Sequence, residues 1–470
     1  MSRLFISAAH KSSGKTTLTA GICAAIAQRQ IKVQPFKKGP DYIDPMWLSM
    51  ASGRSCHNLD FHNMHRTEIL SVFQENTRDS EIAIIEGNKG LFDGVDLEGS
   101  NSNAALAKQL RTPVVLVIDC KGMTRGIAPL LLGYQAFDDD VHIAGVILNK
   151  LGGQRHERKL REIVAHYTNI PVLGAVQYDP ELEISERHLG LIPSNESGIA
   201  EEKLNYITAK INEQVDIDAL LALAKSAPEL PVAQFLYQPA PQGNKVRIGV
   251  AKDKAFGFYY PGDLQALEIA GAELVTIDTL NDAALPDIDG LFIGGGFPET
   301  QAEKLQANVS LRQQIKRAIE NGLPTYAECG GLMYLSRSLC WHGEQYEMVG
   351  VIPGDSIMHP TPQGRGYVKL EETEHALWRT QDETHSNQIY NVHEFHYSSL
   401  DNLGENIHFA YRMKRGHGIN GQHDGIVMYN LTANYAHLRD VEQNRWAGRF
   451  VQFINQCKQE ERFIPVKALG

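Results

Sequence analysis

The sequence is poor in the features that mark secreted, membrane-spanning and metal-centred proteins. Its six cysteines are scattered along 470 residues and form no C-x-x-C pair, which argues against a disulfide framework or a zinc site and fits a reducing cytoplasm. No apolar run approaches the roughly 18 residues needed to cross a bilayer. The first residues lack the apolar core of a signal peptide and are typical of a β-strand. We therefore expect a cytoplasmic protein without membrane contact.

Excess basic charge is also lacking. The chain has 45 Lys and Arg against 56 Asp and Glu, a formal net charge of −11 at pH 7. Because nucleic-acid binding needs a basic face, no nucleic-acid partner is expected, although a local basic pocket for an acidic small molecule is compatible with this balance. The chain is too long for one typical core, so two domains are expected.

Residues 1–195 alternate β-branched apolar runs with helix-like segments, and Gln154–Tyr167 shows a helical period. This βαβα order predicts an α/β fold with a doubly wound parallel sheet. The predicted strands are Leu4–Ala8, Val33–Phe36, Ile82–Glu86, Val114–Asp119, Ile143–Leu148 and Val172–Ala175.

Residues 196–244 are predicted to connect two domains. The segment 196–226 is charged and helix-like, and the closely spaced prolines of 227–243 indicate a semi-stiff linker. A second α/β rhythm occupies 245–458, ends in an amphipathic helix over about 440–458, and leaves 459–470 as a tail. Its predicted strands are Lys245–Ala251, Glu273–Ile277, Gly290–Gly294 and Pro324–Ala327, and 364–437 is rich in strand-like segments.

A phosphate-binding loop follows the first predicted strand. The stretch Ala9–Thr16 fits G-x-x-x-x-G-K-[ST] except for alanine at the first glycine. Backbone N–H groups and the following helix N-terminus would bind phosphate, Lys15 would reach the β- and γ-phosphates, and the Thr16 hydroxyl would bind Mg²⁺. The strand–loop–helix context favours a nucleotide site over a glycine turn that only starts a helix. The predicted ATP contacts are Ser13, Gly14, Lys15, Thr16 and Thr17.

Polar side chains follow other predicted strands, at the sheet edge where α/β folds bind ligands. Asp41 and Asp44 lie past one strand and Glu86 ends another. Such oxygens suit Mg²⁺, although both aspartates are also typical turn formers. The pair Lys37–Lys38 could bind an anionic substrate or be a solvated pair. Asn149 could read an adenine edge or serve only in a turn.

A cysteine elbow marks a second candidate site. Cys329 follows a short predicted strand and precedes two glycines, which places a thiol on a tight turn at a helix N-terminus, as a nucleophilic cysteine requires. The alternative to a catalytic role is that Cys329 is a buried structural cysteine. His437, at the end of a late strand, is the candidate base. The glycines expected to direct N–H groups at an oxyanion are Gly295, Gly296 and Gly330.

A nearby polar cluster contains His393, Glu394 and His396. On an alternating strand His393 would face away from the other two side chains, so all three cannot share one site.

Together, a nucleotide site and a thiol able to split an amide indicate glutamine-fed, ATP-driven amide synthesis.

These motifs resemble those of the cobyrinate a,c-diamide synthase family, the glutamine-hydrolysing amidases of corrinoid synthesis. The resemblance implies a dethiobiotin-synthetase-like N-terminal domain and a class I glutamine amidotransferase C-terminal domain. It also implies glutamine, ATP and an acidic tetrapyrrole as substrates, Mg²⁺ as cofactor, and a homodimer. The matching stretches span nearly the whole chain and include Lys38–Pro45, Gly90–Gly94, Gly145–Asn149, Gly294–Glu299 and His393–Tyr397.

The implied reaction phosphorylates the a- and c-acetates of the macrocycle. Cys329 and His437 then release ammonia from glutamine, and ammonia displaces phosphate from the acyl phosphate. By motif match, Thr16, Asp41 and Glu86 support the metal and Asn149 contacts adenine. The residues implied for the substrate or acyl phosphate are Lys38, Asp41, Tyr42, Asp44 and Lys89.

The chain also departs from the family pattern. Asn88–Lys89 replaces apolar or small residues and adds positive charge near the substrate, and Asp93–Ala105 is distinctive. Both favour a branch acting on siroheme or sirohydrochlorin. Arg439 stands where class I enzymes often have the third triad member, which leaves Asp440 or a Cys–His dyad.

Two other readings stay open. One is a non-enzymatic nucleotide switch of the partition-ATPase type, which the cysteine elbow disfavours. The other is a ligase that takes free ammonia and uses its C-terminal half only as a scaffold.

Overall fold

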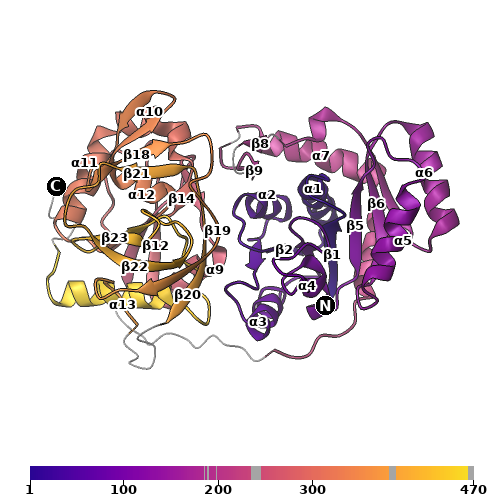
Figure 1. Ribbon diagram of the computed structural model, residues 1–470, viewed down its shortest axis with the longest axis horizontal. Coiled ribbons are helices and arrows are strands. Elements are labelled where there is room, and N and C mark those ends of the chain that lie inside the picture. The colour runs from indigo at the N-terminus through magenta and orange to yellow at the C-terminus, as the bar shows by residue number, and fades with distance from the viewer. Residues whose placement is uncertain (185, 188–189, 197, 234–244, 381–387, 464–470) are drawn as a thin grey trace. The chain divides into compact units, whose positions relative to one another are not determined.

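The computed structural model describes residues 1–470 except 185, 188–189, 197, 234–244, 381–387 and 464–470. The chain divides into two compact units, Met1–Leu236 and Tyr237–Gly470 (Figure 1). Most of the proline-rich linker, residues 188–189 and the tail from 464 lie outside the described residues. Among the residues described, no helix is both long and apolar enough to cross a membrane.

The first unit is built on a seven-stranded sheet of order β3-β2-β4-β1-β5-β6-β7, and all its strand pairs are parallel. The six predicted strands are confirmed, and a short seventh was not predicted. Because the strands are parallel, their carboxyl ends meet at one edge, where the polar motifs lie. The strands are β1 (Ser2–Ala8), β2 (Val33–Lys38), β3 (His57–Leu59), β4 (Ile82–Glu86), β5 (Val114–Asp119), β6 (Ile143–Leu151) and β7 (Val172–Gln177).

Helices cover both faces of this sheet, which confirms the doubly wound fold (Figure 1). The helices α7 and α8, which we assigned to the connecting segment, pack against α1, β1 and β7. The helices are α1 (Lys15–Gln28), α2 (Ile43–Ser52), α3 (Arg66–Asn76), α4 (Asn103–Gln109), α5 (Ile127–Phe137), α6 (Gln154–Tyr167), α7 (Ala200–Gln214) and α8 (Ile217–Lys225).

The second unit contains a nine-stranded mixed sheet of order β12-β10-β13-β15-β24-β23-β22-β19-β20. Its first five strands are parallel and the rest are antiparallel. The strands are β10 (Val246–Ala251), β12 (Ala272–Ile277), β13 (Gly290–Ile293), β15 (Thr325–Glu328), β19 (Gly364–Glu372), β20 (Ile389–His396), β22 (His408–Arg415), β23 (His423–Met428) and β24 (Leu431–Asn434).

A second, four-stranded sheet of this unit has the order β17-β16-β18-β21. Its strands are β16 (Ser336–Trp341), β17 (Glu344–Glu347), β18 (Ile352–Met358) and β21 (Ser398–Asp401), and β11 (Phe256–Phe258) pairs with β14 (Gly295–Gly296). The α-helices of the unit are α9 (Pro261–Ile269), α10 (Ala302–Ala307), α11 (Val309–Glu320), α12 (Gly330–Leu335) and α13 (Trp446–Gln459).

The final helix begins at Trp446, so our start near residue 440 was wrong. Asp440 accepts hydrogen bonds from the Arg445 guanidinium at 3.2 Å and from the Ala447 N–H at 2.9 Å. These bonds hold residues 440–445 in a turn that caps the helix. The helix is amphipathic, as predicted, and Trp446, Phe450 and Ile454 are fully buried on its apolar side.

Candidate active sites

The phosphate loop joins β1 to α1. Gly14 has a φ of 77°, in the left-handed region that favours glycine. A Cβ at this position would lie 2.5 Å from Asn149 Nδ2, which donates to the Ser13 carbonyl at 2.8 Å. Asn149 therefore holds the loop in shape. It also lines a pocket beside the loop with Gly14, Thr17, Leu18, Lys150, Gln177, Tyr178, Asp179, Leu182 and Glu183.

A charged cluster lies beside the loop, at the carboxyl ends of β2 and β4. The buried Lys37 Nζ is 2.5 Å from both Asp44 Oδ2 and Glu86 Oε1. Thr16 Oγ1 donates to the same two atoms, at 3.1 Å to Asp44 and 2.9 Å to Glu86. Lys15 Nζ is 3.9 Å from Glu86 Oε1. Two lysines and two carboxylates thus meet at the phosphate loop.

Opposite charges within this cluster stabilise the ionised forms of Lys37 and Asp44. Burial alone would lower the pKa of Lys37, but the charges of Asp44 and Glu86 outweigh it and raise that pKa above its ordinary value. Burial and the Lys37 charge lower the pKa of Lys15. Burial works against the charged form of Asp44, yet the two lysines hold its pKa below the usual value.

Asp41 lies at the edge of this cluster. Its Oδ1 accepts the N–H groups of Ile43 at 3.0 Å and Asp44 at 3.1 Å, at the start of α2. Its Oδ2 lies 3.9 Å from Lys37 Nζ. Burial and the neighbouring Asp44 raise the pKa of Asp41 to about 7. Of the residues we predicted for the metal, Thr16 and Glu86 share the cluster with Asp44, and Asp41 has one oxygen in the turn that starts α2 and the other near Lys37.

The cluster fits a magnesium ion. Glu86 Oε2 is buried and has no hydrogen-bond partner among the described residues, and the Thr16 hydroxyl and Asp44 supply the oxygen chemistry that Mg²⁺ prefers. Within the described ranges, no three His, Cys, Asp and Glu side chains gather around one metal position. Phosphate oxygens and water would complete the ligand set, as is usual for Mg²⁺.

The predicted substrate lysines lie close to each other. Lys38 Nζ donates to Asn88 Oδ1 at 3.2 Å. Burial lowers the pKa of Lys38 to about 8, an effect that Asp60 opposes and the exposed Lys89 increases. The half-buried Tyr42 precedes α2 on the same edge. Lys38 and Lys89 thus bring two lysine side chains close to each other at this edge of the sheet.

The cysteine elbow of the second unit lies between β15 and α12. Cys329 has a φ of 48°, as expected for a nucleophile on a strained turn. A Cβ at Gly330 would lie 3.0 Å from the Gly296 nitrogen, and one at Gly295 would lie 2.8 Å from His437 Cε1. The three glycines that we predicted for the oxyanion hole therefore surround the cysteine and the histidine.

His437 is buried between two acidic partners. Its Nδ1 lies 3.2 Å from Glu328 Oε2, and its ring shares a hydrogen bond with Cys329. Burial alone would lower the pKa of His437, but these two hydrogen bonds and the accompanying charges raise it to about 10. Both partners therefore favour the positively charged imidazolium form of His437.

Glu328 is the functional residue that the sequence analysis missed. Its Oε1 accepts the Leu438 N–H at 2.8 Å and the Tyr326 hydroxyl, so the carboxylate is fixed against His437. Our candidate Asp440 instead caps α13. The available signal was a charged residue at the end of the predicted strand, directly before the cysteine.

The polar cluster on β20 divides as alternation predicts. The His393 ring stacks on His437, with centroids 5.0 Å apart and planes at 15°. Glu394 and His396 lie on the other face, 3.7 Å apart between Oε2 and Nε2, and Glu394 accepts the Gly418 N–H at 2.8 Å. Only His393 adjoins the cysteine site.

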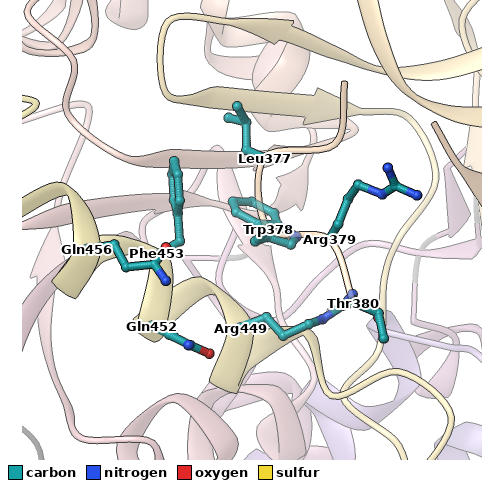
Figure 2. A pocket seen from close by; sticks show the side chains of 8 residues that line it. All are labelled: Leu377, Trp378, Arg379, Thr380, Arg449, Gln452, Phe453 and Gln456. Carbon is teal, nitrogen blue, oxygen red and sulfur yellow. Dashed lines mark hydrogen bonds between the residues drawn. The ribbon is translucent and has the colours of Figure 1, made fainter. Parts of the chain in front are cut away.

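A further pocket of about 400 Å³ lies between α13 and the segment 377–380, which follows β19 (Figure 2). Its Arg449 donates to Glu372 at 2.8 Å and to Thr380 at 2.7 Å. The pocket contains none of the predicted site residues. Its lining is Leu377, Trp378, Arg379, Thr380, Arg449, Gln452, Phe453 and Gln456.

Both units resemble known protein families. Residues 5–192 match the CobQ/CobB/MinD/ParA nucleotide binding domain, and residues 247–444 match the CobB/CobQ-like glutamine amidotransferase domain. The cobyrinate a,c-diamide synthase of Magnetococcus marinus is 47% identical over 96% of this chain and 97% of its own. The cobyrinate a,c-diamide synthase of Methanosarcina acetivorans is 41% identical over 96% of this chain and 95% of its own length. Among solved structures, PurLQS from Thermotoga maritima is 18% identical, covers 45% of this chain and 98% of its own, and has a TM-score of 0.34.

Proposed function

Because the chain belongs to the cobyrinate a,c-diamide synthase family, we propose that it amidates the a- and c-acetates of cobyrinate. Siroheme or sirohydrochlorin is the alternative substrate, favoured by the extra charge of Lys89. The observation that carries the proposal is the Cys329–His437–Glu328 arrangement on a chain that also holds a phosphate loop. A cytoplasmic location and a homodimer are part of the same proposal.

The cysteine site would release ammonia in two steps. The Cys329 sulfur attacks the glutamine amide carbon, and the N–H groups around Gly296 and Gly330 stabilise the oxyanion. The imidazolium of His437 gives its proton to the leaving ammonia, while Glu328 holds the ring at Nδ1. His437 then takes a proton from the water that hydrolyses the thioester, which returns both side chains to their starting states.

The phosphate site would activate the acceptor. An oxygen of the substrate carboxylate attacks the γ-phosphorus of ATP, ADP leaves, and the resulting acyl phosphate loses phosphate when ammonia attacks its carbonyl carbon. Lys15 and Lys37 would offset the charge that develops on the transferred phosphoryl group. Thr16, Asp44 and Glu86 would hold Mg²⁺, which neutralises phosphate charge when bound. Asn149 would border the base in the pocket beside the loop.

The test is the product mass after incubation with ATP, Mg²⁺ and glutamine, using cobyrinate, sirohydrochlorin and siroheme in parallel. Two exchanges of carboxylate for amide on cobyrinate alone would support the main proposal, and amidation of another macrocycle would move it to the alternative branch. ATP hydrolysis without any amidation would contradict the substrate assignment. The control is Cys329→Ala, which should lose glutamine-dependent synthesis and keep synthesis from ammonium.

A further inference from the structure

The ring of His393 lies flat against the ring of His437. Their centroids are 5.0 Å apart and their planes differ by 15°. The backbone joins the same two residues, because the His437 N–H donates to the His393 carbonyl at 2.8 Å. Both side chains are buried. His393 therefore contacts His437 through its backbone and through its side chain, although the proposed reaction gives His393 no role.

The polar contacts of His437 lie at the edge of its ring. Nδ1 lies 3.2 Å from Glu328 Oε2, and the ring shares a hydrogen bond with Cys329. Hydrogen bonds at a ring edge set the direction of the ring within its own plane, and they oppose a tilt out of that plane only weakly. A flat neighbour opposes the tilt, because stacked rings lose contact when one of them turns. The His393 ring therefore supplies the restraint that the hydrogen bonds lack.

Two further side chains hold the His393 ring in turn. The Tyr260 hydroxyl lies 3.4 Å from His393 Nδ1, and the two rings meet edge to face with centroids 6.0 Å apart. The Arg439 guanidinium lies over the Tyr260 ring, 4.8 Å from its centroid. All three side chains are buried. They form a column that runs from Arg439 to His437, with members before α9, on β20 and after β24.

The place of Arg439 in this column agrees with its departure from the family pattern. Arg439 stands two residues after His437, where class I enzymes often have the third triad member. In this chain Glu328 faces Nδ1 instead, from the strand that ends before the cysteine. The side chain at position 439 is thus released from that task, and its cation packs on the face of Tyr260. A residue that the reaction does not use therefore supports the column.

We propose that His393 is a positioning residue for glutamine hydrolysis. Its ring keeps the imidazole of His437 in the plane of its hydrogen bonds, and Tyr260 and Arg439 keep the His393 ring in place. Activation of a thiol by histidine needs this orientation, since the proton moves along the hydrogen bond between the sulfur and the ring. The inference rests on the glutamine-hydrolysing part of the proposed function and does not depend on the macrocycle.

The first test compares three replacements of His393 by steady-state glutamine hydrolysis of the full chain. His393→Ala removes the ring, and we expect kcat to fall by about 10²-fold, as misplacement of a catalytic group does, while KM for glutamine changes little. His393→Asn keeps a polar atom for Tyr260 without a ring and should lose as much. His393→Phe keeps a flat ring and should retain most of kcat. An asparagine variant that matches wild type, or a phenylalanine variant that fails as alanine does, would overturn the proposal.

The matched control is His396→Ala, on the same strand. His396 is also buried, and its ring stacks on Tyr435 with centroids 3.9 Å apart and planes at 7°, on the opposite face of β20. The control therefore removes a stacked histidine of the same kind away from the His437 ring. It should lower the urea midpoint about as far as His393→Ala and leave kcat near the wild-type value. An equal loss of kcat in both variants would indicate general loosening of the fold and would contradict a positioning role.

A second readout needs no turnover. Iodoacetamide alkylates a cysteine as its thiolate, and an oriented His437 stabilises the thiolate of Cys329. We expect His393→Ala to slow the alkylation of Cys329 at neutral pH, as measured by peptide mass spectrometry. Cys340, half-buried on β16, is the internal reference and should react as in wild type. Unchanged alkylation of Cys329 would overturn the inference. A wild type that does not hydrolyse glutamine would instead contradict the proposed function, and the alkylation comparison would still decide the role of His393.

Discussion

At the scale of single residues, Glu328 accompanies His437, the histidine that we propose as the catalytic base. Glu328→Gln removes the charge that faces Nδ1 of His437. We expect the glutaminase kcat to fall by about 10²-fold, with the histidine pKa moving down from its raised value. The measurement is the pH profile of glutamine hydrolysis.

The comparison variant is Asp440→Asn. Asp440 contacts Arg445 and the Ala447 N–H, so its replacement should not change the pH profile of glutamine hydrolysis. A profile that moves equally in both variants would show that Glu328 has no special relation to the histidine.

His437 also links stability to pH. Its folded pKa of about 10 exceeds the ordinary value of 6.5. A pKa raised on folding contributes stability that is complete below pH 6.5 and is lost as pH rises through 10. We therefore expect wild type and His437→Gln to differ most in urea midpoint at the lower pH and to converge at the upper one. A difference that does not change with pH would contradict the raised pKa.

At the scale of elements, Asp424 on β23 holds the segment that carries the histidine. It is fully buried and accepts the N–H groups of Tyr435 at 3.0 Å and Ala436 at 2.8 Å. Burial raises its pKa to about 6, although these hydrogen bonds oppose the shift. Asp424→Ala leaves buried N–H groups without an acceptor, at a cost of about 3 kcal/mol.

Because that segment ends at His437, Asp424→Ala should lower glutaminase activity and keep ammonium-dependent synthesis. Urea unfolding and the two activity assays measure the effects. Asp424→Asn, which keeps one acceptor oxygen, should fall between wild type and the alanine variant. Equal loss of both activities would indicate general unfolding instead.

The elements that could be predicted are those whose burial repeats along the sequence. The strands of the first sheet are almost wholly buried, so their apolar runs identify them. β3 (His57–Leu59) has three residues, too few to show a period. The start of α13 was misplaced because Asp440 forms a cap through contacts that leave no periodic signal.

The site was predictable where the chemistry lies in one local motif. The phosphate loop, the cysteine elbow and the glycines near it are short segments with fixed spacing. Glu328 and His437 are separated by 109 residues, and their contact depends on the pairing of β15 with β24. Lys37, which we left as either a substrate contact or a solvated residue, is 1% exposed because it pairs with Asp44 and with Glu86, and Glu86 is 49 residues away in sequence.

At the scale of the molecule, the two units are expected to respond to different ligands. Met1–Leu236 holds the phosphate loop, and Tyr237–Gly470 has its own hydrophobic core. A ligand that binds only the folded form stabilises it by about 2.7 kcal/mol at one hundred times its Kd. We expect a non-hydrolysable ATP analogue with Mg²⁺ to raise the unfolding temperature of the first unit alone.

Scanning calorimetry measures this shift. Lys15→Ala should abolish it, and Cys329→Ala should keep it, because Cys329 lies in the other unit. A shift that persists in Lys15→Ala would place the nucleotide elsewhere.

The turn at Cys329 has a consequence for how the chain can change over generations. Its φ of 48° is costly for any residue with a side chain, by about 1–3 kcal/mol, and glycine escapes that cost. Cys329→Gly should therefore unfold at higher temperature than Cys329→Ala, although neither variant is expected to hydrolyse glutamine. A lineage supplied with free ammonia would gain robustness by discarding the sulfur, so only continued demand for glutamine hydrolysis keeps a cysteine at this position.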